Sequence, residues 1–126
     1  MAGDHDGLCT ITPYFTVGDA DAFIAFAIAA FEARLILENR YDDNRIQHAR
    51  LQIGNSIIML NQATDEFSAN TSQVHLFVAD VDVAYDAALR AGAVSLMEPN
   101  IRPHGDVMAG VKDPCGNIWW VAAPQG

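Results

Sequence analysis

The sequence predicts an α+β protein built from two copies of a strand–helix–three-strand (βαβββ) module. Its 126 residues, 51% of them hydrophobic, are too few for two ordinary domains and enough for one domain with a real core. Strand-like and helix-like patterns follow one another in the same order twice, and the segment Phe15–Asp21 aligns with Leu76–Asp82. We therefore expect one domain over residues 1–126, with module one at about 10–62 and module two at about 73–123.

Module one is expected to begin with a strand over 10–17, where β-branched and aromatic residues alternate with period two. Pro13 should place this strand at a sheet edge or near a strand start. Asp19 is suited to cap a helix over 20–31. After its first turn this helix carries no charge, so we expect it to be buried on more than one side, against module two or a second copy. If Glu32 ends the helix in a left-handed conformation, its β-carbon costs about 1 kcal/mol. Three strands should follow at 34–38, 45–53 and 55–60, with a turn at Gly54–Asn55 and a polar loop at 61–71.

Module two repeats this order. A strand is expected over 73–79, and Asp80 or Asp82 should cap a helix that runs through 83–90. Gly92 is placed to end that helix. Short strands should follow near 95–98, at 106–112 and at 117–122, with a tight turn at Asp113–Gly116 joining the last two.

Composition excludes several classes of function. Sixteen acidic residues face seven basic ones, and the net charge of −9 disfavours binding to nucleic acids and to anionic membranes. No apolar run approaches the roughly 18 residues of a membrane span. The acidic, polar start at 1–6 is unlike a secretory signal, so we expect a cytoplasmic protein. Cys9 and Cys115 lie too far apart in the sequence to suggest a disulfide framework or a cysteine-rich zinc site.

The order of the elements, the segment Val81–Ala93 and the C-terminal segment Gly105–Trp120 with its Asp-Pro-Cys-Gly-Asn turn resemble the vicinal oxygen chelate superfamily. This superfamily includes glyoxalase I, bleomycin-resistance proteins and extradiol dioxygenases, and the resemblance covers roughly residues 10–123. It implies curved mixed sheets around a cup, and in many members a homodimer that shares the cup. In the enzymes it also implies a divalent metal, held by ligands from the first and fourth strands of each module.

Carried over residue by residue, this metal site is incomplete. His75 matches a ligand position, whereas Tyr14 stands at its counterpart in module one and Trp120 stands where the metalloenzymes have glutamate. The fourth strand of module one offers only the apolar residues 57–60. A catalytic divalent metal needs about three N, O or S ligands, so we expect no metal and no other cofactor here. A non-standard set remains an alternative: His75 and His48 with Glu38 or Glu98.

The sheet faces that turn away from the helices are expected to line the cup. In module two, alternation places His75 and Phe77 on that face. Trp119 and Trp120 are adjacent and must point to opposite faces, and the resemblance assigns Trp120 to the cup. An indole at this position suits stacking of a planar or apolar ligand, although it could also simply fill the cup.

In module one, the same alternation places Tyr14, His48 and Arg50 on the cup side. Arg50 would favour a carboxylate or another anion, and Tyr14 could donate a phenolic hydrogen bond. The alternative for His48 and Arg50 is a solvent-facing edge, or an ion pair with Asp42 or Asp43.

These residues favour a metal-independent protein that binds a small planar or apolar molecule, of the drug-sequestering (antibiotic-resistance) or metabolite-binding kind, as a homodimer. One alternative is a metal-dependent lyase, isomerase or dioxygenase. Another is a metal-free enzyme with His75 as general base and Arg50 or Tyr14 polarising a carbonyl. A third is an interaction protein whose cup is filled. Whether the chain is an enzyme stays open at this point.

Overall fold

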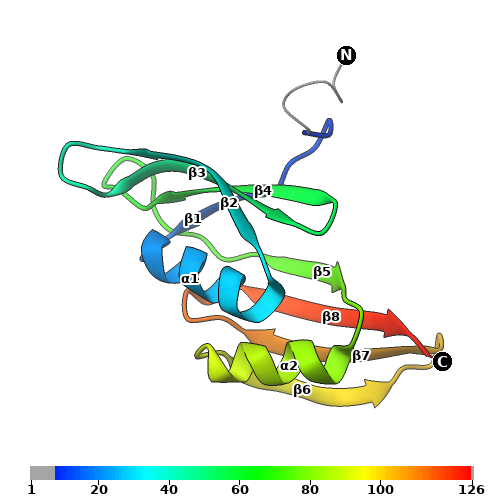
Figure 1. The fold of residues 1–126 in the computed structure, drawn as a ribbon. Coiled ribbons are helices and arrows are strands. Elements are labelled where there is room, and N and C mark those ends of the chain that lie inside the picture. The colour runs from blue at the N-terminus through cyan, green and yellow to red at the C-terminus, as the bar shows by residue number, and fades with distance from the viewer. Residues whose placement is uncertain (1–7, 126) are drawn as a thin grey trace.

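The computed structural model describes residues 8–125, in which two four-stranded sheets and two helices are formed (Figure 1). Module one comprises β1 (Tyr14–Val17), α1 (Ala20–Phe31), β2 (Arg34–Arg40), β3 (Ile46–Ile53) and β4 (Ser56–Gln62). Module two comprises β5 (Gln73–Phe77), α2 (Val81–Arg90), β6 (Val94–Ile101), β7 (Asp106–Lys112) and β8 (Ile118–Pro124). The predicted fold class, α+β with two βαβββ modules, is confirmed.

The internal repeat extends to the register of the strands. The sheet orders are β1-β4-β3-β2 and β5-β8-β7-β6, and in each sheet the first strand runs parallel to the fourth. Tyr14 pairs with Met59 in the first sheet, and His75 pairs with Trp120 in the second. These two pairs are separated by the same offset along the chain. Tyr14 is therefore structurally equivalent to His75, and Met59 is equivalent to Trp120.

Both helices begin and end with the local chemistry that their sequences predict. The side chain of Asp19 accepts a hydrogen bond from the amide of Ala22 at 3.0 Å, and Asp80, not Asp82, caps α2. Helix α1 ends at Glu32, which has a left-handed φ of 57°. Gly92 follows α2 with a φ of 108°, a conformation that glycine adopts readily.

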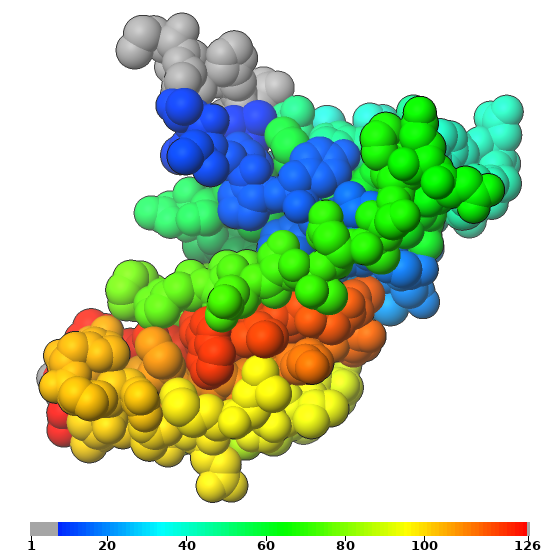
Figure 2. Space-filling model, turned by 180° about the vertical axis from the view of Figure 1, so that it is seen from behind, coloured from blue at the N-terminus to red at the C-terminus, as the bar shows by residue number. Residues whose placement is uncertain are grey.

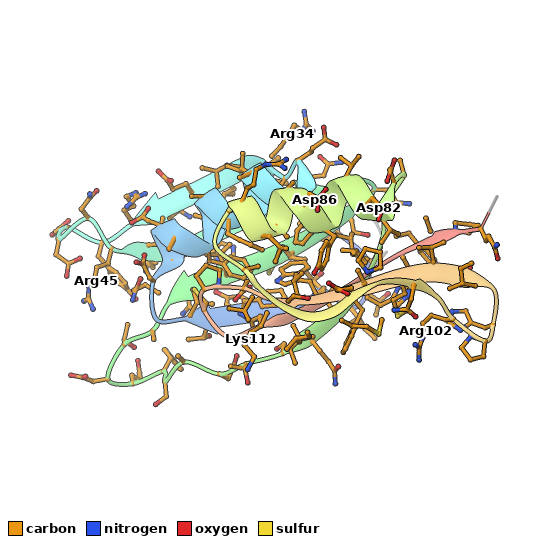
Figure 3. All side chains as sticks on the ribbon, turned by 90° about the horizontal axis from the view of Figure 1, so that it is seen from below. Arg34, Arg45, Asp82, Asp86, Arg102 and Lys112 are labelled. Carbon is orange, nitrogen blue, oxygen red and sulfur yellow. The ribbon has the colours of Figure 1, made fainter. Side chains whose placement is uncertain are left out.

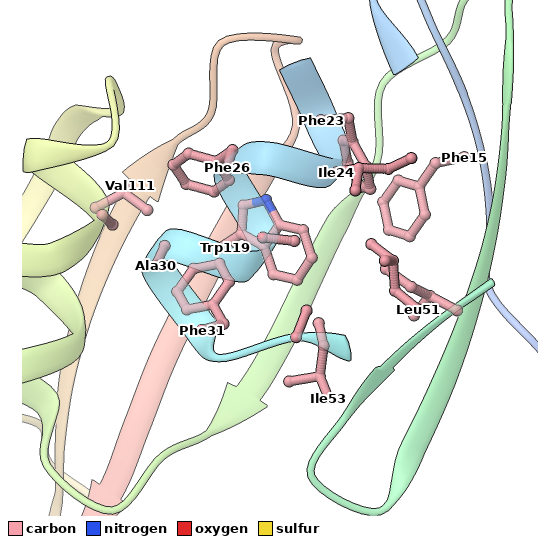
Figure 4. Packing of buried hydrophobic residues seen from close by; sticks show 14 of the residues in the cluster. Phe15, Phe23, Ile24, Phe26, Ala30, Phe31, Leu51, Ile53, Val111 and Trp119 are labelled. Carbon is pink, nitrogen blue, oxygen red and sulfur yellow. The ribbon is translucent and has the colours of Figure 1, made fainter. Parts of the chain in front are cut away.

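A single tryptophan ties the two modules together. Helix α1 packs on the first sheet and against α2, while α2 covers β6, β7 and β8. Trp119 on β8 is fully buried, and its ring centroid lies 4.9 Å from that of Phe31, 5.9 Å from that of Phe15 and 6.2 Å from that of Phe23 (Figure 4). Helix α1 is thus buried on the sides that face both modules, whereas its uncharged residues Ala25, Ile28 and Ala29 are exposed.

Several strand boundaries differ from the prediction, most clearly those of β1 and β6. The first strand begins at Tyr14, not at residue 10, and Ile11 lies outside it with 85% of its surface exposed. The backbone pairing with β4 starts where the carbonyl of Pro13 accepts from the amide of Met59. Because proline has no N–H, it cannot extend the ladder further. Strand β6, by contrast, is longer than predicted, because it runs over Val94–Ile101 and includes Pro99. An edge strand tolerates a proline because one of its sides has no partner to pair with.

Charged side chains stay at the periphery. Arg34, Arg45, Asp82, Asp86, Arg102 and Lys112 all point outward (Figure 3). Asp113 is the one buried charged side chain among residues 8–125. No helix in this described part of the chain is long and apolar enough to cross a membrane. The acidic segment 1–6, on which the predicted location depends, lies outside the described residues.

Candidate functional site

Each sheet buries one face under the helices and leaves the other uncovered, and we call the uncovered sides the open faces. In module one, the burial of alternate residues along β3 fixes which side chains belong to which face. Its open face includes Tyr14, Thr16, His48, Arg50, Gln52, Ile57, Met59 and Asn61, together with their register partners on β2, Arg34, Leu37 and Asn39. The open face of module two is formed by Gln73, His75, Phe77, Met108, Gly110 and Trp120.

Trp120 lies on the open face of module two, half-buried, with its six-membered ring close against Gly110 of the neighbouring strand. A β-carbon placed on Gly110 would sit 2.3 Å from Cζ3 and 2.6 Å from Cε3 of the indole, so only glycine leaves room for the ring. The indole Nε1 donates a hydrogen bond to Oε1 of Gln73 at 2.8 Å. The backbone of Gly110 and the amide of Gln73 thus contact the indole from two sides and fix its place on the open face.

His75 and Phe77 flank this indole on β5. His75 is the register partner of Trp120, and its ring centroid lies 4.8 Å from that of Phe77 in an edge-to-face arrangement. Phe77 is 69% exposed, which is unusual for a phenylalanine on a regular strand. Among the described residues, no side chain hydrogen-bonds to the imidazole of His75. Nothing there orients it as a general base.

The polar cluster of module one is hydrogen-bonded. Oη of Tyr14 lies 3.0 Å from Nδ1 of His48, and Nε of Arg50 donates to Nε2 of His48 at 3.4 Å. Asp43, one of the two carboxylates named as alternative partners of His48 and Arg50, forms an ion pair with Arg45 at 2.8 Å. The three predicted residues of module one are thus brought together by the structure, on a face separate from that of Trp120.

Electrostatics keep both titratable groups of this cluster uncharged at neutral pH. Burial, together with the positive charge of Arg50, lowers the pKa of His48. Burial, with a smaller contribution from Tyr41, raises the pKa of Tyr14. The amide Oδ1 of Asn61, on the same face, is buried and has no hydrogen-bond partner within the described part of the chain. The cluster therefore offers neutral hydrogen-bonding groups beside one fixed cation.

The residues at the metal positions of the resemblance do not fit a metal. The paired registers place Tyr14, Met59, His75 and Trp120 there: a phenol, a thioether, an imidazole and an indole. An indole has no lone pair to give, and only one of the four is a common ligand of divalent metals. Over residues 8–125 no three His, Cys, Asp or Glu side chains lie close enough to hold an ion. The alternative set of His75, His48 and Glu38 or Glu98 is not assembled.

A pocket of about 220 Å³ lies at the junction of the two modules. Its walls are mainly apolar and come from the segment 9–13 before β1, from the β3–β4 hairpin, from β5 and from Trp119, with His75 among the lining residues. Seen from behind, the chain that leads from β4 into β5, drawn in green, runs between the two modules (Figure 2). Neither Tyr14 nor Trp120 lines this pocket. The pocket nevertheless borders both open faces, because Ile57 of module one and His75 of module two line it.

Sequence reasoning missed two residues that position Trp120. Gln73 stands two residues before His75, so alternation alone puts it on the same face. Gly110 is the one residue of β7 without a side chain, and a glycine inside a strand often marks the close approach of another group. Both signals were present in the sequence, but neither identifies its partner.

The chain was also compared with known proteins. The model of the Glyoxalase/Bleomycin resistance protein/Dioxygenase superfamily matches residues 10–121. Uncharacterized proteins of Mycobacterium tuberculosis (strain H37Rv) and Mycobacterium bovis are each 30% identical over 125 residues, which cover 90% of this chain and 74% and 82% of those proteins.

Solved structures resemble the fold. TioX from Micromonospora sp. ML1 matches with a TM-score of 0.78 and 23% identity, over 91% of this chain and 98% of TioX. A glyoxalase-related enzyme from Fulvimarina pelagi matches with a TM-score of 0.72 and 19% identity, over 90% of this chain and 86% of that one. At these identities the likeness extends to the fold and no further.

Proposed function

Because the chain belongs to the Glyoxalase/Bleomycin resistance protein/Dioxygenase superfamily, we propose that it is a metal-independent binding protein whose ligand stacks on Trp120. The ligand class is a small planar, largely apolar molecule, such as an aromatic drug or metabolite. The observation that carries this proposal is the placement of the indole, which packs closely against Gly110 and is held by Gln73.

A ring held in this way is suited to stacking. A free tryptophan side chain on a sheet would lose rotational freedom when a ligand bound, whereas this indole is already fixed by its neighbours. The indole is partly exposed, and the exposed ring of Phe77 and the imidazole of His75 extend the aromatic surface along β5. Stacking of a planar group on an aromatic side chain contributes about 1–3 kcal/mol.

The same residues argue against a metal-dependent reaction. The superfamily positions hold Tyr14, Met59, His75 and Trp120, and Trp120 occupies the place where a carboxylate would be required. We therefore derive no catalytic step through a metal.

We further propose that a second copy of the chain completes the cup. The open faces of the two sheets carry exposed apolar side chains, including Tyr14 and Phe77, which a partner would cover. A dimer would bring the open face of module one in one protomer to that of module two in the other, with the ligand between them. Size-exclusion chromatography with light scattering should report a dimer at micromolar concentration.

Calorimetry with 2-naphthamide, a neutral planar probe, tests the binding proposal. Replacement of Trp120→Ala should weaken binding about tenfold, since 1.4 kcal/mol corresponds to a factor of ten. Phe67→Ala is the matched control, because Phe67 is also an exposed aromatic residue but lies in the loop after β4. The control should leave the affinity unchanged, as should prior treatment with EDTA. Binding that survives Trp120→Ala, or that requires a divalent metal, would overturn the proposal.

A further inference from the structure

We propose that the pocket at the junction of the two modules receives an apolar substituent of the ligand whose planar group stacks on Trp120. This inference rests on the proposed function and narrows its ligand class to a planar group with an uncharged alkyl chain of about four to six carbons. The polar link between the two parts would meet the imidazole of His75, which lines the pocket.

The pocket lies beside the free edge of β5. Within the described part of the chain, β5 is the outermost strand of its sheet and pairs only with β8. Val74, His75 and Leu76, three consecutive residues of this strand, all line the pocket. Because consecutive side chains of a strand point to opposite faces, a space that all three reach lies at the edge of the strand and not over one face. A ligand on the open face of module two can therefore reach the pocket by passing over this edge.

One row of side chains separates the pocket from the stacking surface. Trp120 is the register partner of His75, and neighbouring strands lie about 4.8 Å apart. The path from the indole to the far side of β5 thus crosses about two strand spacings, roughly 10 Å. A bicyclic ring on Trp120 followed by an amide link has a similar length. An alkyl chain beyond that link would enter the pocket.

The lining of the pocket selects an uncharged, apolar group. Ile53, Ile57, Leu76 and the buried ring of Trp119 are among its apolar lining residues, and no Asp, Glu, Lys or Arg of the described chain lines it. A charged group placed there would have no ion-pair partner, which is costly. Since a cavity of about 150 Å³ holds a benzene molecule, this pocket of about 220 Å³ has room for a somewhat larger group, such as an alkyl chain of about four to six carbons.

His75 supplies a polar contact beside the pocket. Its ring packs edge-to-face against that of Phe77, with the centroids 4.8 Å apart. Among the described residues no side chain hydrogen-bonds to this imidazole, so in its neutral form it offers one N–H donor and one acceptor nitrogen to a ligand. An amide carries both a carbonyl acceptor and an N–H donor, so it complements either tautomer. An amide link at this point is therefore matched to His75.

The dependence of affinity on the length of the alkyl chain is the first test. Calorimetry compares N-methyl-, N-butyl-, N-hexyl- and N-octyl-2-naphthamide on the unmodified protein. Each buried methylene contributes up to about fourfold in affinity, and ordering of the alkyl chain offsets part of this gain. We therefore expect the N-butyl probe to bind about tenfold more tightly than the N-methyl probe, and the gain to end at N-hexyl, when the pocket is full. Equal binding of the first two probes, or a gain that continues undiminished to N-octyl, would overturn the inference.

Thr12→Trp tests where the alkyl chain lies. Thr12 lines the pocket and precedes β1, so a larger side chain there fills the pocket without interrupting a strand. In this variant the N-butyl probe should bind no more tightly than the N-methyl probe. The matched control is Thr10→Trp, because Thr10 is exposed in the same segment but does not line the pocket. The control should retain the preference, and its retention in Thr12→Trp would overturn the inference.

His75→Phe tests the polar link. This variant keeps an aromatic ring but removes both nitrogens, and it should weaken the N-butyl probe about fivefold, as expected for one lost hydrogen bond. His104→Phe, in the loop before β7, is the matched control and should leave the affinity unchanged. Equal affinities of the unmodified protein and His75→Phe would show that the link does not meet His75.

The two proposals fail in different ways. If Trp120→Ala weakens both the N-methyl and the N-butyl probe while Thr12→Trp leaves the preference intact, the pocket inference is wrong and the stacking proposal stands. If Trp120→Ala changes neither affinity, the stacking proposal itself is wrong, whatever the effect of Thr12→Trp.

Discussion

The substitution Gly110→Ala tests the packing of Trp120 without touching the indole. The added β-carbon would lie 2.3 Å from Cζ3 of the ring, more than 1 Å inside normal carbon–carbon contact, about 3.5–4.0 Å. The backbone of Gly110 is part of a regular strand and does not have a positive φ, so alanine itself is tolerated there. The ring must therefore leave its place over β7, and its hydrogen bond to Gln73 is lost.

Two opposing contributions set the size of the effect. Overpacking of this kind costs about 1–3 kcal/mol, whereas alanine in place of glycine inside a strand gains about 0.5–1 kcal/mol. In the unmodified protein we expect a net loss of about 1 kcal/mol in the free energy of unfolding. In a Trp120→Ala background the ring is absent, and the same substitution should stabilise the protein by about 0.5–1 kcal/mol.

Urea unfolding followed by far-UV circular dichroism measures all four members of this double-mutant cycle. The change of sign gives a coupling free energy of about 2 kcal/mol, well above the roughly 0.5 kcal/mol expected for independent sites. Equal effects of Gly110→Ala in both backgrounds would show that the indole does not lie over this strand.

Three further predictions concern stability. Glu32→Gly should raise the free energy of unfolding, measured with urea, by about 1 kcal/mol, because Glu32 has a left-handed φ of 57°, which glycine adopts without a β-carbon clash. Glu66→Gly, in a loop, is the control and should not stabilise the protein. Asp113→Asn should lower the free energy of unfolding by about 2 kcal/mol, because the carboxylate accepts from the amides of Cys115 and Asn117 and from Nε1 of Trp119, and an amide nitrogen facing that indole N–H cannot accept. The loss should be smaller in a Trp119→Phe background, and an undiminished loss would refute this explanation. Folding lowers the pKa of His48, so the unfolded chain binds the proton more strongly and the protein should lose stability as the pH drops below about 6.5. His48→Gln should reduce that loss, measured as thermal midpoints from pH 7.5 to 5. A variant with the same pH profile as the unmodified protein would contradict the lowered pKa.

Much of the fold could be predicted because its signals are local. The boundaries of α1 follow from Asp19 and from the apolar run after it, and the left-handed Glu32 follows from where that run ends. The repeat aligned Tyr14 with His75 correctly, since period-two alternation leaves little freedom in register. The full length of β6 was not predicted, because a proline such as Pro99 is disfavoured inside a paired strand. Only the sheet order shows that β6 is an edge strand, where a proline is tolerated.

The site was harder to predict because its contacts join residues far apart in the sequence. Alternation could place Tyr14, His48 and Arg50 on one face, but not the hydrogen bonds between them. The role of Gly110 depends on the ring of Trp120, which reaches it only across the β7–β8 pairing. Trp119 illustrates the same limit, since its contact with Phe31 of the other module has no signature in either segment alone.

The most direct test of the stacking proposal is an NMR titration that follows the two indole N–H signals. Nε1 of Trp120 bonds Gln73 on the open face, while Nε1 of Trp119 bonds the buried Asp113, so the second signal is an internal control. Addition of 2-naphthamide should shift the signal of Trp120, assigned by its loss in Trp120→Phe, and leave that of Trp119 in place. A saturable shift of Trp119 with Trp120 unmoved would place the ligand elsewhere and contradict the proposal.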